Sequence, residues 1–115
     1  MQEEILQKLN IDKEKLVGVW KAEEVDEYWK EKGFVVLTKE EFIFVYENNL
    51  AKPKVRVKLE QLKRATKIPL LGIEISWKSE GGGFLKKIFG GGRLILKISE
   101  GESFLAKIKN FLPSH

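Results

Sequence analysis

Apolar residues recur at helical spacing near both ends of the chain and alternate with polar residues in between. Over residues 2–9, Ile5, Leu6 and Leu9 follow an acidic first turn, which is the pattern of a short amphipathic helix. Asn10 comes next and readily adopts the left-handed conformation that ends a helix. The pattern therefore predicts a helix over residues 2–9.

From Leu16 onward the pattern changes to that of β-strands. Charged or turn-forming stretches separate three segments rich in β-branched and aromatic residues, LVGVWKAEEV, GFVVLT and EFIFVYE. A loop with Pro53 follows, and then KVRVKLE alternates, with Val55, Val57 and Leu59 on its inner side. This part of the chain predicts strands over all four segments.

The following segments also read as strands. LKRATKI is a weak strand that ends at Pro69, because proline is disfavoured inside a sheet. GIEISWKS alternates strictly, and so does the segment from Arg93 to Ile98. Their apolar positions, which should face one core, are Ile73, Ile75, Trp77, Leu94, Leu96 and Ile98.

The end of the chain predicts an amphipathic helix. Ser99 and Glu102 form an S-x-x-E capping pattern at its start, and Pro113 stops it. Its apolar residues at helical spacing are Phe104, Leu105, Ile108, Phe111 and Leu112. The whole order, with about seven strands between two helices, predicts a mostly β fold: a small antiparallel barrel or sandwich capped by the C-terminal helix.

Length and composition fit one domain. The 115 residues, 43% hydrophobic and 33% charged, suit a single core. No apolar run approaches the ~20 residues of a membrane-spanning helix, and the start MQEEILQKLN lacks signal-peptide features, so we expect a cytoplasmic protein that can lie at a membrane surface. The chain has no cysteine for a disulfide, and its Lys- and Glu-rich composition with one Met is of the kind found in heat-adapted proteins.

The net charge of +4 conceals an asymmetry along the chain. Residues 1–50 hold 7 Lys and Arg against 12 Asp and Glu, whereas residues 51–115 hold 14 against 5. The basic half favours an anionic partner such as a phospholipid surface or nucleic acid. Alternatively, acidic and basic strands interleave in the fold and their fields cancel.

Two segments resemble the pleckstrin-homology (PH) superfold, and within it the GRAM-like or bacterial and archaeal PH-like domains. GFVVLTKEEFIFVYE is similar to the strand, Leu-Thr turn and strand of that family, and VKLEQLKRA is similar to its next segment. With the closing helix, the resemblance covers residues 16–112, the core of a single domain over residues 1–115. It implies a PH-like fold and a binding role without catalysis, toward phospholipid head groups, peptides or protein domains.

The segment between the first two predicted strands departs from the lipid-binding members of that family. Those members carry a Lys and Arg cluster there, whereas EEVDEYWKEKG carries five carboxylates and only two lysines. Carboxylates at this place would repel a phosphate. The resemblance therefore implies an anion site elsewhere, if the chain has one.

The segment GGGFLKKIFGGG is the first candidate interaction site. As a helix it would gather its apolar residues on one side and its lysines on the other. So short a helix is unstable in water, so another surface must hold it. Either it caps an open barrel end, or it is a finger that inserts among lipids or into a partner's groove; a phosphate-binding glycine loop would need a G-K-[ST] continuation. The finger residues are Phe84, Leu85, Lys86, Lys87, Ile88 and Phe89.

The second candidate is a basic face that the strands KVRVKLE and LKRATKI would share if they pair. Such a face would bind the phosphates of nucleic acid in a salt-dependent manner, or it is ordinary solvated surface that protects edge strands. Aromatic residues for base stacking lie in apolar runs instead, which favours lipid or protein over nucleic acid. The basic face consists of Lys52, Lys54, Arg56, Lys58, Lys63, Arg64 and Lys67.

Aromatic and titratable residues add little to these candidates. Trp20 and Trp77 occupy strand positions suited to the core, whereas Tyr28 and Trp29 are either packed on the barrel or exposed for a protein contact. The single histidine, His115, lies in the tail, and no spacing of His, Cys or Asp suggests a metal site. We therefore expect no enzyme activity, cofactor or metal.

These patterns together predict a PH-like interaction module that binds an anionic membrane surface or a protein partner through residues 84–89. Nucleic-acid binding through the basic face is the alternative.

Overall fold

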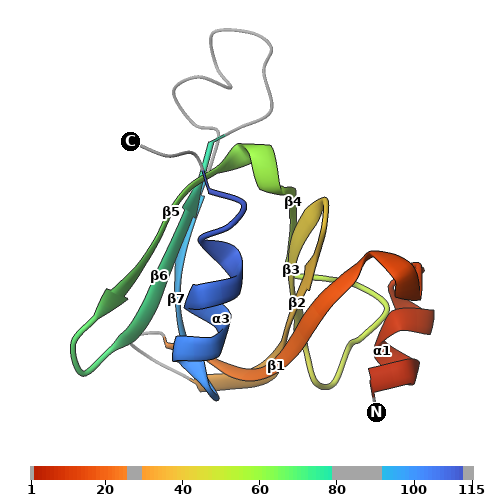
Figure 1. Cartoon of the computed structure of the whole chain (residues 1–115). Helices are drawn as coiled ribbons and strands as arrows, with labels where there is room; N and C mark the ends of the chain where they lie inside the picture. The colour runs from red at the N-terminus through yellow and green to blue at the C-terminus, as the bar shows by residue number, and fades with distance from the viewer. Residues whose placement is uncertain (1, 26–29, 79–91, 113–115) are drawn as a thin grey trace, which may run out of the picture.

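A computed structural model describes residues 2–25, 30–78 and 92–112, which form a mostly β fold (Figure 1). Within these ranges the chain has seven antiparallel strands in one sheet, a short N-terminal helix and a C-terminal helix, which confirms the predicted fold class. The elements are α1 (Gln2–Lys8), β1 (Leu16–Val25), β2 (Lys30–Thr38), β3 (Glu41–Tyr46), β4 (Val55–Lys58), β5 (Leu62–Ile68), β6 (Gly72–Trp77), β7 (Gly92–Ile98) and α3 (Gly101–Ile108), with short 3-10 helices η1 (Lys13–Lys15) and η2 (Leu59–Gln61).

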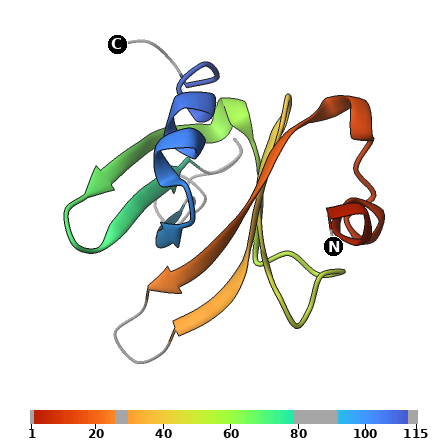
Figure 2. The same cartoon turned by 60° about the horizontal axis from the view of Figure 1, so that its bottom comes forward.

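The sheet has the strand order β4-β3-β2-β1-β7-β6-β5. Neighbours in this order follow one another along the chain except at the centre, where β1 pairs with β7. In that pairing Ala22 lies opposite Ile98, and the Ser99 N–H extends the contact by donating to the Lys21 carbonyl at 2.9 Å. The sheet bends, so that β1–β4 and β5–β7 enclose a common interior with α3 at its opening (Figures 1 and 2).

Strands β4 and β5 lie at the two ends of this order and do not pair with each other. β4 pairs with β3, and β5 pairs with β6. The reason is η2, which turns the chain between them and sends β5 to the other half of the sheet. The condition for one continuous basic face, that these two strands pair, is therefore not met.

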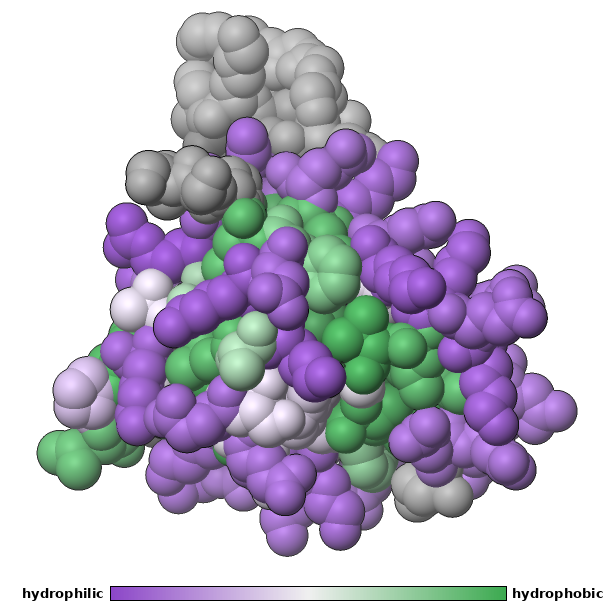
Figure 3. Space-filling view, viewed as in Figure 1, coloured by the Kyte–Doolittle hydropathy of each residue, from purple (hydrophilic) through white to green (hydrophobic). Residues whose placement is uncertain are grey.

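The main core lies between the two halves of the sheet, and α3 fills its open side. Phe104 is fully buried, and its ring meets those of Trp20 and Phe42 edge-on, with centroids 5.3 Å and 6.2 Å away. Leu105 and Ile108 of the same helix face are also buried. On the face shown in Figure 3, apolar side chains remain visible between α3 and the strands of the first half.

A second, smaller core lies on the outer face of β2 and β3. Ile5 and Leu9 pack there against four apolar strand residues, and Arg56 fixes the end of the helical segment by donating to the Leu9 carbonyl at 2.9 Å. Because one face of β2 meets the main core and the other meets α1, every residue from 33 to 38 is buried. The continuous apolar run GFVVLT follows from this double burial.

The two predicted helix boundaries have different outcomes. Asn10 has φ 57°, which confirms the left-handed residue after the first helix. The Ser99 and Glu102 capping box is wrong, because α3 begins at Gly101 after Glu100, which has φ 57° and makes no side-chain capping bond. The backbone of Ser99 is instead used in pairing with β1.

Candidate interaction surface

The first predicted site, the finger of residues 84–89, lies outside the described residues. The residues that flank the segment 79–91 are described: Trp77 pairs with Gly92, and Gln61 holds Lys78 in place. The Gln61 side chain donates to the Lys78 carbonyl at 3.3 Å, and the Gln61 carbonyl accepts from the Lys78 N–H at 2.8 Å. The described chain therefore breaks off after β6 and resumes at the neighbouring end of β7.

The second predicted site, the basic face, is divided and partly neutralised. Lys54 pairs with Glu24, Arg56 pairs with Glu41 through two nitrogens at 2.9 Å and 3.0 Å, and Lys67 pairs with Glu102 at 3.0 Å. Because each of these cations has a carboxylate partner, the remaining field is weaker than the sequence suggests. The other members are Lys52, Lys58, Lys63 and Arg64, of which Lys58 also has a partner.

The two tryptophans predicted to belong to the core, Trp20 and Trp77, are found there. Trp20 is buried in the main core, and Trp77 is partly buried and packs against it. Tyr28, Trp29 and His115 lie outside the described residues. Within the described residues, no group of three His, Cys, Asp or Glu side chains is placed to hold a metal, and no helix is long and apolar enough to cross a membrane.

A buried carboxylate in β1 was not predicted from the sequence. Glu24 accepts a hydrogen bond from the Tyr46 hydroxyl at 2.6 Å, and the Lys54 ammonium donates to both of its oxygens, at 2.6 Å and 3.1 Å. The signal was present, because Trp20, Ala22 and Glu24 occupy successive inward positions of one strand. Glu24 therefore accepts hydrogen bonds from both Tyr46 and Lys54, and the cluster ties β1 to β3 and to the β3–β4 connection.

The environment of this cluster shifts two pKa values. Burial raises the pKa of Tyr46, and its hydrogen bond to Glu24 raises it further. Burial by itself would lower the pKa of Lys54, but the hydrogen bonding to Glu24 and Tyr46 and the charge of Glu24 together outweigh burial, so the pKa rises. Both groups therefore keep their protons at neutral pH.

The turn between β5 and β6 exposes apolar side chains. Leu70 is 98% exposed and Leu71 is 44% exposed. The Leu71 N–H donates to the Ile68 carbonyl at 3.1 Å, which closes a four-residue turn with Pro69 at its second position and Leu70 at its third. Leu70 has φ 69°, a conformation that normally selects Gly or Asn at the third position of such a turn.

The turn approaches β7 closely at Gly72. Gly72 has φ 138°, and a Cβ atom at this position would lie 2.4 Å from the Leu96 carbonyl oxygen, so only glycine fits. Figure 1 shows the turn projecting at the lower left of the molecule, and Figure 3 shows apolar atoms at the same corner. Sequence reasoning missed this site, although two leucines between Pro69 and Gly72 are unusual where turns are normally polar.

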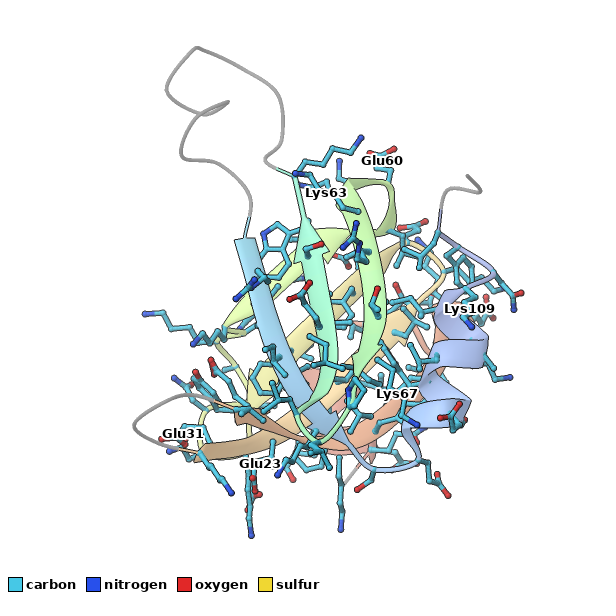
Figure 4. The ribbon with its side chains drawn as sticks, turned by 90° about the vertical axis from the view of Figure 1, so that its left-hand side faces the viewer. Glu23, Glu31, Glu60, Lys63, Lys67 and Lys109 are labelled. Carbon is cyan, nitrogen blue, oxygen red and sulfur yellow. The ribbon has the colours of Figure 1, made fainter. Side chains whose placement is uncertain are left out.

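A hollow of about 340 Å³ lies between this turn and the start of α3. Leu70, Ile73, Ile98 and Leu105 contribute its apolar lining. The ion pair of Lys67 and Glu102 also lines the hollow, and Figure 4 labels Lys67 where β5 approaches α3. We call the exposed turn residues 69–71 together with this hollow the leucine tip.

Comparisons with known proteins give the fold and no activity. No protein-family model matches the chain, and the search of curated proteins found no match. The chain is similar in structure to the C-terminal domain of an unknown protein from Leishmania infantum, with a TM-score of 0.61 and 13% sequence identity over 97% of this chain and 95% of that one. At this identity the likeness shows a shared fold alone.

Proposed function

We propose that the protein is a non-enzymatic interaction module that attaches reversibly to a phospholipid membrane through the leucine tip. The observation that carries this proposal is Leu70, which is almost fully exposed in a strained backbone conformation. The left-handed conformation costs a residue with a Cβ about 1–2 kcal/mol. Neither folding nor solubility favours leucine there, whereas contact with an apolar medium does.

The shape of the leucine tip favours a membrane over a rigid protein groove. The turn projects from the end of the sheet, so the interfacial region of a bilayer can surround it. Full burial of two leucine side chains would contribute about 3–6 kcal/mol, an upper bound for shallow insertion. Binding of this strength is reversible, and stable attachment would need a second contribution, such as attraction between charged residues and lipid head groups.

Nucleic-acid binding has less support from the described surface. Its cations would share one continuous face only if β4 and β5 paired, but these strands lie at opposite ends of the strand order. Three of the seven are paired with carboxylates. The proposed resemblance to PH-like domains is compatible with the strand order and the C-terminal helix, and it agrees with a binding role.

The leucine tip and the predicted finger would orient the protein differently. The tip precedes β6 and the chain continues from the other end of β6 toward the finger residues, so six strand residues, or about 17 Å, separate the tip from that end. One flat membrane would therefore meet one end of β6 or the other. An experiment that removes each set of apolar residues in turn separates the two orientations.

The test is flotation of purified protein with vesicles of phosphatidylcholine and phosphatidylserine. We compare wild type with Leu70→Ser/Leu71→Ser and with Phe84→Ala/Phe89→Ala, after circular dichroism shows that each variant is folded. Binding by wild type and the Phe84/Phe89 variant, with loss in the leucine variant, is the expected result. Loss only in the Phe84/Phe89 variant would assign the contact to the finger. If the wild-type protein does not float with the vesicles, the membrane proposal is overturned. The leucine tip would then be tested as a contact for a protein partner.

A further inference from the structure

A second hollow lies beside the leucine tip, on the outer face of β1, β2 and β7. Its volume is about 500 Å³. Phe34 and Ile98 contribute apolar atoms to its lining. Figure 4 labels Glu23 at this end of the sheet, where charged side chains extend away from the body. The charged groups that line the hollow are Lys21, Lys32, Lys97, Glu23 and Glu47.

Opposite charges alternate across this hollow. Glu23 of β1 lies in register with Lys32 of β2 on one side and with Lys97 of β7 on the other. Side chains in direct register have Cβ atoms about 5 Å apart, so these three groups face the same small volume. Within the described residues, none of the five charged side chains is engaged in an ion pair or hydrogen bond. They are therefore available to a ligand that carries both signs of charge.

The mixed lining selects a chemical class of ligand. A purely anionic head group, such as that of phosphatidylglycerol, would meet the carboxylates of Glu23 and Glu47 next to the lysines. A head group with both a phosphate and a primary ammonium matches the lining, because lysines donate to phosphate oxygens and carboxylates accept from the ammonium. The quaternary ammonium of phosphatidylcholine has no N–H to donate.

We infer that this hollow binds the head group of an aminophospholipid, phosphatidylserine or phosphatidylethanolamine. The inference rests on the proposed membrane contact of the leucine tip. In this arrangement Lys21, Lys32 and Lys97 hold the phosphate, and Glu23 and Glu47 hold the ammonium.

The position of the hollow relative to the tip supports this assignment. Lys97 and Ile98 line both hollows, so the two lie next to each other along β7. The close approach of Gly72 to the Leu96 carbonyl fixes the turn against the same strand. When Leu70 and Leu71 enter the bilayer interface, the second hollow therefore lies at the level of the head groups.

The test compares two lipids of equal charge. Vesicles of phosphatidylcholine contain the same mole fraction of either phosphatidylserine or phosphatidylglycerol, so only the amino group and its carboxylate differ from the glycerol head. We expect about tenfold tighter binding to phosphatidylserine, as one charge-assisted hydrogen bond would give. A second pair of vesicles, with and without phosphatidylethanolamine, tests the primary ammonium without a net charge, and tighter binding to the vesicles that contain it is expected.

The variant Glu47→Gln should remove the preference for phosphatidylserine and leave binding to phosphatidylglycerol unchanged or stronger. Glu60→Gln is the matched control, because Glu60 is also exposed but lies at the other end of the sheet (Figure 4). Equal binding of wild type to both lipids would overturn the aminophospholipid inference while the membrane proposal stands. Binding to neither lipid would overturn both, and a preference that Glu47→Gln leaves intact would assign it to another site.

Discussion

The ammonium nitrogen of Lys54 lies 2.6 Å from a carboxylate oxygen of Glu24, and this contact joins the β3–β4 connection to β1. The other oxygen accepts the Tyr46 hydroxyl at 2.6 Å. Glu24 is only 6% exposed, so its carboxylate depends on these two donors for the hydrogen bonds that water would otherwise provide. The cluster therefore stabilises the fold mainly by keeping a buried charge satisfied.

Removal of the Lys54 ammonium should destabilise the protein. We expect Lys54→Met to lower the free energy of unfolding by about 1–3 kcal/mol, because Glu24 would stay buried with one donor fewer. Urea denaturation followed by tryptophan fluorescence measures the change. Lys52→Met is the control, since Lys52 is exposed and a surface substitution should change stability by less than about 0.5 kcal/mol. Equal losses in both variants would contradict the assigned role of the cluster.

The same cluster predicts how stability depends on alkaline pH. The pKa values of Tyr46 and Lys54 are raised above their ordinary values of 10.0 and 10.5. Each group therefore contributes its full stabilisation below its ordinary pKa and loses it as the pH rises through the raised one. Stability should stay level through neutral pH and fall from about pH 10 upward.

Thermal denaturation as a function of pH measures this fall. The double variant Tyr46→Phe/Lys54→Met should lose less stability than wild type between neutral and strongly alkaline pH, because neither shifted group is present. A slope as steep as that of wild type would assign the alkaline loss to other residues.

Relief of strain in the leucine tip should stabilise the fold and weaken binding. Leu70→Asn should raise the free energy of unfolding by about 0.5–1 kcal/mol, because Asn tolerates a positive φ better than Leu does. Binding to vesicles should fall at the same time. Leu71→Asn is the matched control: Leu71 is not among the residues with positive φ, so its variant should weaken binding without a gain in stability. If the Leu70→Asn variant is stabilised but binds vesicles as well as wild type does, Leu70 does not take part in the membrane contact.

The plug formed by α3 should dominate the stability of the main core. Phe104→Ala should cost about 3–5 kcal/mol, because it empties a fully buried position beside Trp20 and Phe42. Lys107→Ala, on the exposed side of the same helix, should change stability little. Calorimetric melting of both variants tests this, and a small effect of Phe104→Ala would mean that the opening can close without the helix.

Alternation of apolar residues predicted the strands well, because one face of most strands meets the core. Val55 and Leu59, Ile73 and Ile75 are buried as the pattern requires. The sequence could not show that α1 covers the outer face of β2, because a run buried on both faces has no alternation to read. It also could not show which strands end the sheet, since that depends on the direction in which η2 turns the chain.

The site was harder to predict than the fold. Composition directed attention to glycines and lysines, whereas the structure singles out an exposed leucine in a strained turn. Exposure and φ arise only when the chain is folded, so no periodicity reveals them. The glutamate at an inward position of β1 was a readable signal, but its partners Tyr46 and Lys54 lie far away in sequence.

The central pairing of β1 with β7 has a consequence for the order in which the chain folds. The other strand pairs join consecutive strands, but residues 22–24 can meet residues 96–98 only after a long loop has closed, at a large entropic cost. We therefore expect the β1–β7 pairing, which we call the seam, to form after the folding transition state. Leu96→Ala should then speed unfolding and barely slow refolding, whereas Val36→Ala in β2 should slow refolding more. Stopped-flow kinetics in urea would show the contrast, and a strongly slowed refolding of Leu96→Ala would place the seam in the nucleus. A seam that closes last and opens first would set the lifetime of the native state.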